Sequence, residues 1–321
     1  MNKPQCPICG TPSNLVRDLP SDFLRDALGE YYLERMPDGV NIGSYQLLRC
    51  PRCDAGFCEP MTPGDATFYS WIAPKAGYYP QSRWEWGEVT NEIKKRGVRP
   101  ASLLEVGCGS GSFLEGVLGD PAVRAVGLDT EAGSIAKCTE KGCEAYCEDI
   151  SAFLSRNPGR QFDFVVAFHC LEHVAEPMVF LRAMLSALKP GGSIFVSTPY
   201  SPMSFETGWF DPLNHPPHHM TRWNARAYQE AATQLGLDVR LRMPKAFNPL
   251  RRAKDAIILR KFGTRGAPSK LGILWALFGN PMLLLSEIRK QRSRERLGGF
   301  CAADVVLAEF RNATNSVRAL G

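Results

Sequence analysis

A glycine-rich stretch at residues 103–113 constrains the fold of this chain more than any other feature. An apolar run ends at Glu105, glycines follow at Gly107, Gly109 and Gly111, and an apolar helical pattern begins near Phe113. Glycines at a strand-to-helix turn let the backbone fold tightly and let a ligand approach where a Cβ atom would block it. The spacing is G-x-G-x-G, not the G-x-G-x-x-G of dinucleotide-binding folds. A ligand-binding βα turn is predicted here, with a plain turn as the alternative.

Further motifs follow in order along the chain. Residues 123–128 are apolar and end at Asp129, and an acidic residue at the end of a second strand can bind both hydroxyls of a ribose. An acidic turn lies at residues 146–150, an apolar run with a polar loop at 162–174, and a Pro-Gly turn leading into a strand at 188–199. The alternation of strands and helices predicts a parallel, doubly wound sheet.

These five ordered motifs, led by E-x-G-x-G-x-G, resemble the class I S-adenosylmethionine (SAM) methyltransferases over residues 100–245 and 299–311. The resemblance implies an α/β fold with a doubly wound, mostly parallel, seven-stranded Rossmann-like sheet, and SAM as the cofactor. It also implies a set of cofactor-binding residues: Glu105, Gly107, Cys108, Gly109, Gly111, Asp129, Asp149, Ile150 and Phe168.

Several elements can be placed from local patterns. Helices are expected over residues 84–96, 178–188 and 225–235, the last with Asn224 as N-cap. Strands are expected over 237–242 and 303–310.

Two C-x-x-C pairs near the N-terminus have the spacing of zinc ligands: Cys6 with Cys9, and Cys50 with Cys53. Two thiolates in a tight turn can bind one ion, and two such turns complete tetrahedral coordination of Zn2+. The 40 residues between the pairs exceed the usual spacing, so a helix over residues 22–32 is expected to fill the gap. A redox role is disfavoured because no βαβ pattern surrounds either pair. The pairs resemble the zinc ribbons that precede some sugar and natural-product methyltransferases, and we expect a structural role.

All five histidines lie between positions 169 and 219, after the fourth and fifth predicted strands, where ligands of a doubly wound sheet bind. The stretch from Asn214 to Trp223 resembles an H-P-P-x-H segment of this family that approaches the active site. An alcohol or phenol acceptor needs a base, and histidine has a suitable pKa. The candidate bases, in order of preference, are His173, His219, His218 and His169, each with a structural role as the alternative. A metal site at His215, His218 and His219 is a weaker hypothesis, since Asp211 is the only carboxylate close in sequence.

Charge helps to choose the substrate. The net charge is +5, but residues 250–296 carry 12 basic against 3 acidic residues, and residues 1–60 carry 6 against 8. An acidic ribbon is a poor phosphate binder, and residues 168–173 lack the Asn/Asp-Pro-Pro-Tyr pattern of enzymes that methylate base nitrogens. Nucleic acid is therefore not the expected substrate. No apolar signal segment follows Met1, so we expect a cytoplasmic protein.

The chain divides into an expected zinc-ribbon module (1–61), an aromatic linker and helix over the cofactor (62–99), a SAM-binding core (100–245), a basic and apolar insertion (246–298) and a last strand with a tail (299–321). The apolar residues 271–285 are too short to span a membrane, and we expect a lid, with weak membrane-surface contact through 250–296 as the alternative.

The functional hypothesis is a SAM-dependent methyltransferase acting on oxygen or carbon of a small-molecule acceptor: a sugar, a sugar nucleotide, or a polyketide- or quinone-like metabolite. An RNA methyltransferase that grips its substrate through the ribbon and a non-catalytic SAM-fold assembly protein remain the alternatives. The sequence does not specify an oligomeric state.

Overall fold

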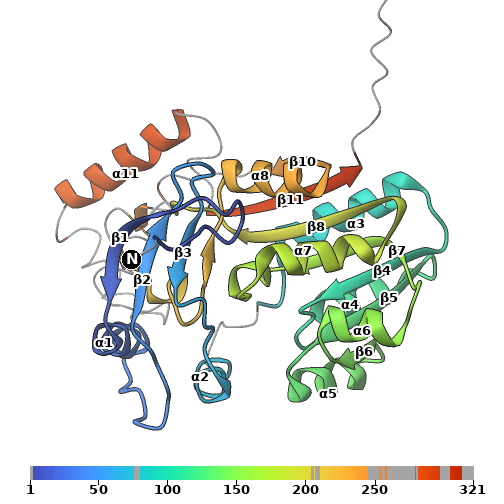
Figure 1. Cartoon of the computed structure of the whole chain (residues 1–321), viewed down its shortest axis with the longest axis horizontal. Helices are drawn as coiled ribbons and strands as arrows, with labels where there is room; N and C mark the ends of the chain where they lie inside the picture. Colours follow the sequence, from blue (N-terminus) through green and yellow to red (C-terminus); the bar gives the residue numbers. More distant parts are fainter. Residues whose placement is uncertain are drawn as a thin grey trace, which may run out of the picture.

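The computed structural model describes residues 3–75, 80–203, 206, 210–244, 250, 253–254, 257–258, 279, 281–296 and 304–312. Its centre is a seven-stranded sheet in the order β10-β11-β8-β7-β4-β5-β6. The strands are β4 (Ala101–Val106), β5 (Val123–Asp129), β6 (Glu144–Cys147), β7 (Phe162–Phe168), β8 (Leu188–Pro199), β10 (Leu237–Arg242) and β11 (Val305–Asn312). All neighbours pair in parallel except β11, which is antiparallel to both β8 and β10. The predicted seven-stranded, mostly parallel, Rossmann-like sheet is confirmed (Figure 1).

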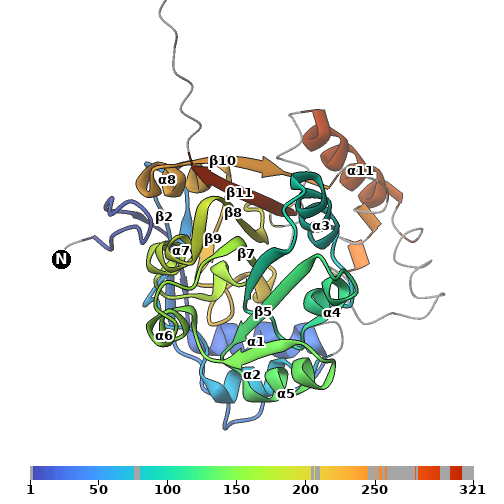
Figure 2. The same ribbon diagram turned by 90° about the vertical axis from the view of Figure 1, so that its right-hand side faces the viewer.

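Helices lie on both faces of this sheet (Figures 1 and 2). They are α3 (Trp84–Arg96), α4 (Ser112–Leu118), α5 (Ala132–Glu140), α6 (Ile150–Arg156), α7 (Pro177–Ser186) and α8 (Ala225–Leu235). Helix α8 has the expected bounds because the Asn224 side chain caps it by accepting from Ala227 N. Helix α7 ends two residues earlier than predicted, because Leu188 already belongs to β8. Strand β11 likewise begins at Val305, two residues later than predicted.

A second, four-stranded antiparallel sheet contains β1 (Asn14–Leu19), β2 (Tyr45–Arg49), β3 (Gly56–Glu59) and β9 (Thr221–Arg222), in that order. Helix α1 (Ser21–Tyr32) fills the gap between the two cysteine pairs as expected, and α2 (Ala66–Ile72) follows β3. Strand β9 comes from the other half of the chain, after β8, and pairs Phe57 with Thr221. The N-terminal residues therefore share a sheet with the segment that contains the histidines.

The two sheets also share a hydrophobic core. One cluster of buried side chains includes Cys6 and Phe57 from the N-terminal part, Leu104 from β4, and Trp223 and Tyr228 from the segment around α8. Trp223 and Tyr228 are completely buried and their rings lie 4.9 Å apart. Packing at this junction is thus continuous from the cysteine pairs to the central sheet.

Ion pairs hold α3 against the antiparallel edge of the sheet. Arg96 on α3 lies 3.3 Å from Glu309 on β11, and Glu92 on α3 lies 3.1 Å from Arg242 and 2.7 Å from Arg311. Both carboxylates are buried. Buried charges are tolerated when they are paired in this way, so the position of α3 is well defined.

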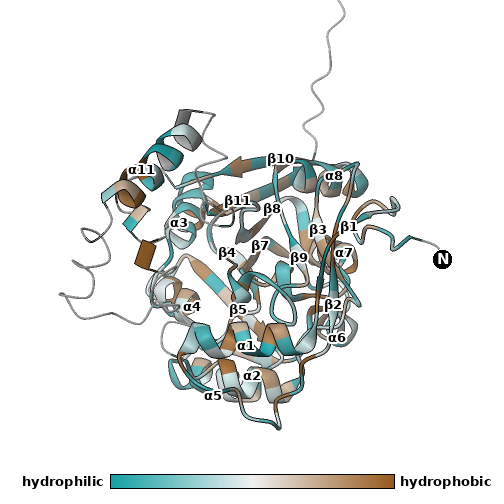
Figure 3. Ribbon diagram, turned by 90° about the vertical axis from the view of Figure 1, so that its left-hand side faces the viewer, coloured by the Kyte–Doolittle hydropathy of each residue, from teal (hydrophilic) through white to brown (hydrophobic). Residues whose placement is uncertain are grey.

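The basic insertion is described only in part. The apolar residues 271–285 lie mostly outside the described residues, and with them the lid and membrane-surface hypotheses. Helix α11 (Pro281–Arg296) belongs to it, with apolar first turns and charged later ones (Figure 3). Among the residues that the structure describes, no helix combines the length and apolar character needed to cross a bilayer.

Candidate active site

The glycine turn between β4 and α4 has the conformation that only glycine adopts readily. Gly107, Gly109 and Gly111 all have positive φ angles, of 77°, 51° and 75°. A Cβ atom on Gly107 would lie 2.9 Å from Cys170 Sγ, so the loop after β7 packs directly against this turn. The turn therefore brings the ends of β4 and β7 together at one edge of the sheet.

Asp129 ties the end of β5 to the same turn. Gly109 N donates to its Oδ2 at 2.8 Å and Glu131 N donates to its Oδ1 at 2.9 Å. Burial raises the pKa of this carboxyl group above its usual range. Each oxygen keeps a second lone pair, so both can still accept a hydrogen bond from a ligand.

Glu105, at the end of β4, is a buried carboxyl group with an unsatisfied oxygen. It is 3% exposed, and within the described part of the chain its Oε2 atom has no hydrogen-bond partner. Burial, with the nearby Asp129 charge, raises the pKa of Glu105 well above its usual range. A cationic or hydrogen-donating ligand at this edge would satisfy it.

Three aromatic rings from different elements meet beside the turn. Phe168, the last residue of β7, lies 4.9 Å from Phe113 on α4, centroid to centroid. Trp86 on α3 lies 6.1 Å from Phe113 and 6.4 Å from Phe168. Of the expected cofactor residues, Phe168 is thus part of an aromatic wall, and the linker helix α3 supplies Trp86 to it.

The remaining expected cofactor residues have local roles. Asp149 caps α6, since Ala152 N donates to its Oδ1 at 2.8 Å, and Ile150 is buried in the core. The Cys108 side chain packs toward Gly127 on β5, because a Cβ atom there would lie 2.8 Å from its Sγ. Asp149 therefore acts on this edge of the sheet by capping α6, and Cys108 acts on it by packing against β5.

His169 is held between two buried carboxylates. Its Nε2 lies 3.0 Å from Glu85 Oε1 on α3, and its Nδ1 lies 3.4 Å from Glu172 Oε1. Burial lowers the pKa of His169, but Glu172 and Glu85 outweigh this and raise it. A raised pKa reduces the fraction of His169 that is neutral and able to accept a proton at a given pH, and the two contacts of its ring join α3 to the loop after β7.

His173, His218 and His219 form a compact group, which we call the histidine triad. Their ring centroids lie 4.5 to 4.7 Å apart. Burial lowers the pKa of all three, and that of His218 reaches about 3. All three are therefore neutral imidazoles near neutral pH.

The remaining histidine lies outside the triad. His215 Nδ1 donates to Asp211 O at 2.7 Å, and its Nε2 accepts from Arg222 Nη1 at 3.3 Å. Its ring stacks on Phe210 with centroids 4.1 Å apart. The trio considered from the sequence, with His215 in place of His173, is thus not the one that the fold brings together.

With this geometry in place, comparison with known proteins identifies the family. A family model described as a methyltransferase domain matches residues 81–241, half of the chain. The chain belongs to this methyltransferase family.

Curated relatives of this methyltransferase are also named as methyltransferases. One is a probable S-adenosylmethionine-dependent methyltransferase from Mycolicibacterium smegmatis, 30% identical over 137 residues, which are 43% of this chain and 52% of that protein. Another is a ubiquinone biosynthesis O-methyltransferase from Marinobacter nauticus, 39% identical over 101 residues, 30% of this chain and 42% of that protein. The chain spans about half the length of the curated relatives it matches.

Among solved structures, a SAM-dependent methyltransferase from Archaeoglobus fulgidus aligns with a TM-score of 0.50 at 17% identity, covering 76% of this chain and 99% of that one. At this identity the alignment shows a shared fold. The family match and the relatives together support the prediction of a SAM-dependent methyltransferase.

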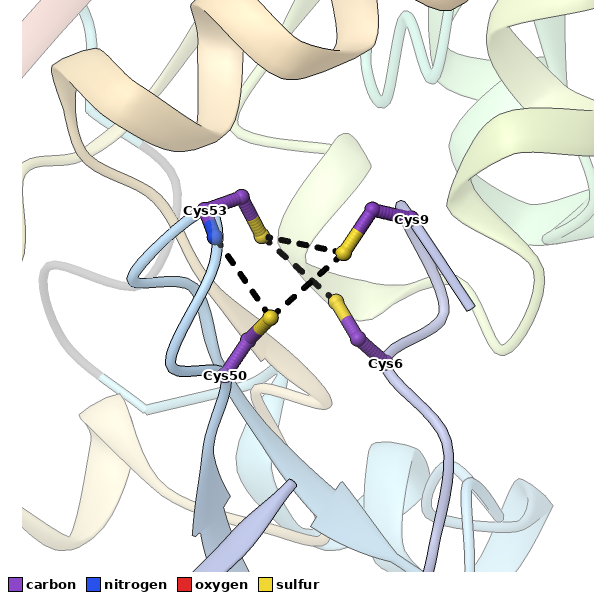
Figure 4. A group of neighbouring side chains, drawn as sticks. All are labelled: Cys6, Cys9, Cys50 and Cys53. Atoms are coloured by element: carbon purple, nitrogen blue, oxygen red, sulfur yellow. Dashed lines mark hydrogen bonds between the residues drawn. The ribbon is translucent and has the colours of Figure 1, made fainter. Parts of the chain in front are cut away.

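The family match leaves the N-terminal cysteines of this methyltransferase outside it. Cys6, Cys9, Cys50 and Cys53 are free thiols whose sulfur atoms converge (Figure 4). The separations are 3.6 Å from Cys6 to Cys53, 3.4 Å from Cys9 to Cys50, and 3.8 Å from Cys9 to Cys53. Sulfur atoms on a tetrahedral zinc ion lie about 3.8 Å apart. The donor set and its spacing both fit one zinc ion.

Sequence reasoning missed three side chains at this site: Glu85, Glu172 and Asn214. Glu172 stands between His169 and His173 in the sequence, but nothing local indicates that it is buried. Glu85 reaches the site from a helix 84 residues before His169. Only the burial of these polar side chains marks them, and burial is a property of the fold.

Proposed function

We propose that this chain transfers a methyl group from SAM to an oxygen or an acidic carbon of a small-molecule acceptor. The observation that carries this proposal is the joining of Asp129 to the glycine turn, with the unsatisfied carboxyl group of Glu105 beside it. SAM carries ribose hydroxyls, which donate hydrogen bonds, and a cationic methionine end, so it offers a partner to each carboxyl group. Several curated relatives are named ubiquinone biosynthesis O-methyltransferases, which favours an oxygen acceptor.

In this proposal Asp129 accepts hydrogen bonds from the ribose, while Gly107, Gly109 and Gly111 allow the close approach of the ligand. Glu105 faces the cationic end, and the aromatic wall of Trp86, Phe113 and Phe168 excludes water. SAM supplies a methyl group that is already activated on a sulfonium. The protein then has mainly to align the acceptor and keep water away.

A base is needed where the acceptor is a hydroxyl group, and the histidine triad suits this role. His173 donates its Nδ1–H to His218 O at 2.7 Å, so Nε2 is the nitrogen with the lone pair. Because burial keeps the imidazole neutral, it is ready to accept a proton near pH 7. We place His173 first, with His219 and His218 as neighbours that shape its surroundings.

We also propose that the four cysteines hold one structural Zn2+. Four thiolates leave no open coordination position, which is the pattern of a structural site. The cysteine turns lie against the strand that pairs with β9, so the ion would stabilise the histidine segment as well as its own turns.

The cofactor proposal predicts the effect of Asp129→Ala. Loss of charge-assisted hydrogen bonds should weaken binding of SAM and S-adenosylhomocysteine by about 2 kcal/mol, roughly 30-fold. Isothermal titration calorimetry on wild-type and variant protein measures this difference. Asp238→Ala, an exposed aspartate on β10, is the matched control and should bind as wild type does. Absence of heat with either ligand on folded wild-type protein would overturn the assignment.

A further inference from the structure

The three imidazoles of the histidine triad have the arrangement of a metal site, and nothing in the proposed base mechanism requires three of them. His173 comes from the loop after β7, whereas His218 and His219 come from the segment before β9. One ring nitrogen from each residue lies within 4.8 Å of the others. We propose that His173, His218 and His219 bind a divalent transition-metal ion, distinct from the ion at the cysteines.

The hydrogen bonds of the triad support this proposal most directly. Each Nδ1 atom lies beside a carbonyl oxygen: His218 O at 2.7 Å from His173, Leu213 O at 2.8 Å from His218, and Asn214 Oδ1 at 3.1 Å from His219. A carbonyl oxygen can only accept, so every Nδ1 carries the proton and every Nε2 carries the lone pair. Metal-binding histidines almost always donate their second nitrogen to such an oxygen, which sets the tautomer and the ring orientation.

Asn214 shows that this orientation is built by the surroundings. Its side-chain amide nitrogen donates to Glu206, which assigns its Oδ1 to His219. His215, one turn earlier in the same segment, differs because Arg222 already donates to its Nε2. The loop thus keeps one histidine out of the group while it aligns the other two.

Charge near the triad also favours a cation. Glu172, adjacent to His173 in the sequence, is 1% exposed, and neither carboxylate oxygen has a hydrogen-bond partner among the described residues. His169 Nδ1 lies 3.4 Å from its Oε1, and the same ring is shared with Glu85. The positive charge of Arg83 also acts on Glu85 and His169. A metal ion beside the triad would still give Glu172, whose oxygens lack a hydrogen bond within the described residues, an electrostatic partner.

The chemistry of the donors indicates the class of metal. Imidazole nitrogen suits zinc, copper, iron and nickel, and three histidines with an open fourth position are typical of catalytic rather than structural zinc. Nitrogen atoms on a tetrahedral zinc ion lie about 3.3 Å apart, closer than the 4.8 Å within which one ring nitrogen of each residue lies here. At the cysteine cluster, by comparison, four sulfur donors would fill all four coordination positions of the ion.

The position of the triad suggests its role, and this part rests on the proposed function. His173 N donates to Cys170 O at 3.0 Å, and Cys170 packs on Gly107 of the cofactor turn. With an ion bound, Nε2 of His173 would be a metal ligand and no longer the general base, and an acceptor hydroxyl at the open metal position would lose its proton to water more readily. Its oxygen would then form the new bond to the methyl carbon as the carbon–sulfur bond breaks, leaving S-adenosylhomocysteine.

Metal content of the full-length protein tests the site. Wild-type protein equilibrated with zinc and then dialysed should retain about two ions per chain, and His219→Ala should retain one. His215→Ala is the matched control, with a similarly buried histidine from the same segment, and should keep two. Asn214→Ala should weaken the second site by roughly 10- to 100-fold, because it removes the oxygen that orients His219.

Cobalt(II) added to protein that already holds zinc at its cysteines provides a second readout. A visible spectrum of nitrogen-bound cobalt should develop in wild type and in His215→Ala, and not in His219→Ala. If His219→Ala does not fold, His173→Gln, at the less buried member, replaces it. Wild-type protein that retains a single ion and gives no such spectrum would overturn the proposal, as would full retention in a folded His219→Ala. SAM calorimetry on the same samples is independent of metal uptake, so failure of the metal site and failure of the proposed function can be told apart.

Discussion

Loss of the zinc ion that we propose for the four-cysteine site should loosen the histidine segment as well as the N-terminal turns. Structural zinc contributes on the order of 10–16 kcal/mol to the folding of small zinc modules. Here the cysteine turns lie next to β3, whose Cys58 N donates to Met220 O at 3.1 Å. Asn224 also donates to Asp54 O at 2.7 Å, one residue after Cys53. Loss of the proposed metal should therefore loosen β3, the strand with which β9 pairs.

Hydrogen exchange measured by mass spectrometry on Cys50→Ser checks this expectation. Peptides covering residues 45–59 and 215–224 should exchange faster than in wild type, whereas peptides from β4 and β7 should change little. Cys147→Ser, an exposed thiol outside the cluster, is the matched control and should exchange as wild type does. Zinc loss with unchanged protection at 215–224 would show that the two halves are not coupled.

Mild acid should destabilise this protein steeply. His173, His215, His218 and His219 all have pKa values lowered by burial, and that of His218 reaches about 3. In the unfolded chain each titrates near 6.5, so below that pH the unfolded state binds more protons and the free energy of unfolding falls. The loss approaches about 1.4 kcal/mol per pH unit for each histidine that stays neutral when folded. Four such groups give several kcal/mol between pH 7.5 and pH 5.

His169 acts in the opposite direction. Its pKa is raised by Glu172 and Glu85, so its contribution is complete below pH 6.5 and is lost as the pH rises through the folded-state pKa. This single histidine with a raised pKa offsets only part of the acid destabilisation that the four histidines with lowered pKa values cause.

Urea unfolding at pH 7.5, 6 and 5 measures the slope. His215→Gln should flatten it by up to about 1.4 kcal/mol per pH unit, because one histidine that must stay neutral is gone. Acid would also release zinc from the proposed four-cysteine site, but that contribution cancels when the variant is compared with wild type at each pH. Equal slopes for the two proteins would contradict the assignment of His215 as a neutral buried group.

The parts of the fold that sequence predicts well are those encoded by local pattern. The glycine turn, the apolar run ending at Asp129 and the capped helix from Ala225 to Leu235 each depend on residues within about ten positions of one another. Their order along the chain then determines the sheet, since few topologies satisfy the rules for parallel connections.

The features that sequence did not predict depend on contacts between distant residues. The pairing of Phe57 with Thr221 joins positions 164 apart, and the bond from His169 to Glu85 joins positions 84 apart. The sequence names His173 as the first candidate base, but it does not predict that this residue joins His218 and His219 in one group. His215 lies outside the group, and Arg222 donates to its Nε2. No local pattern carries that information.

The short strand β9 limits where this protein can be divided into stable fragments. A fragment beginning near residue 81, where the family match starts, would retain Thr221 and Arg222 but lack the strand that pairs with them. It would also lack Phe57 and the other N-terminal members of the buried cluster that contains Trp223 and Tyr228. An unpaired backbone edge beside uncovered aromatic rings is prone to self-association, so the boundary of the matched domain is not a boundary at which this chain can be cut. For the same reason, exchanging N-terminal segments between relatives would succeed only if residues 217–224 were exchanged with them.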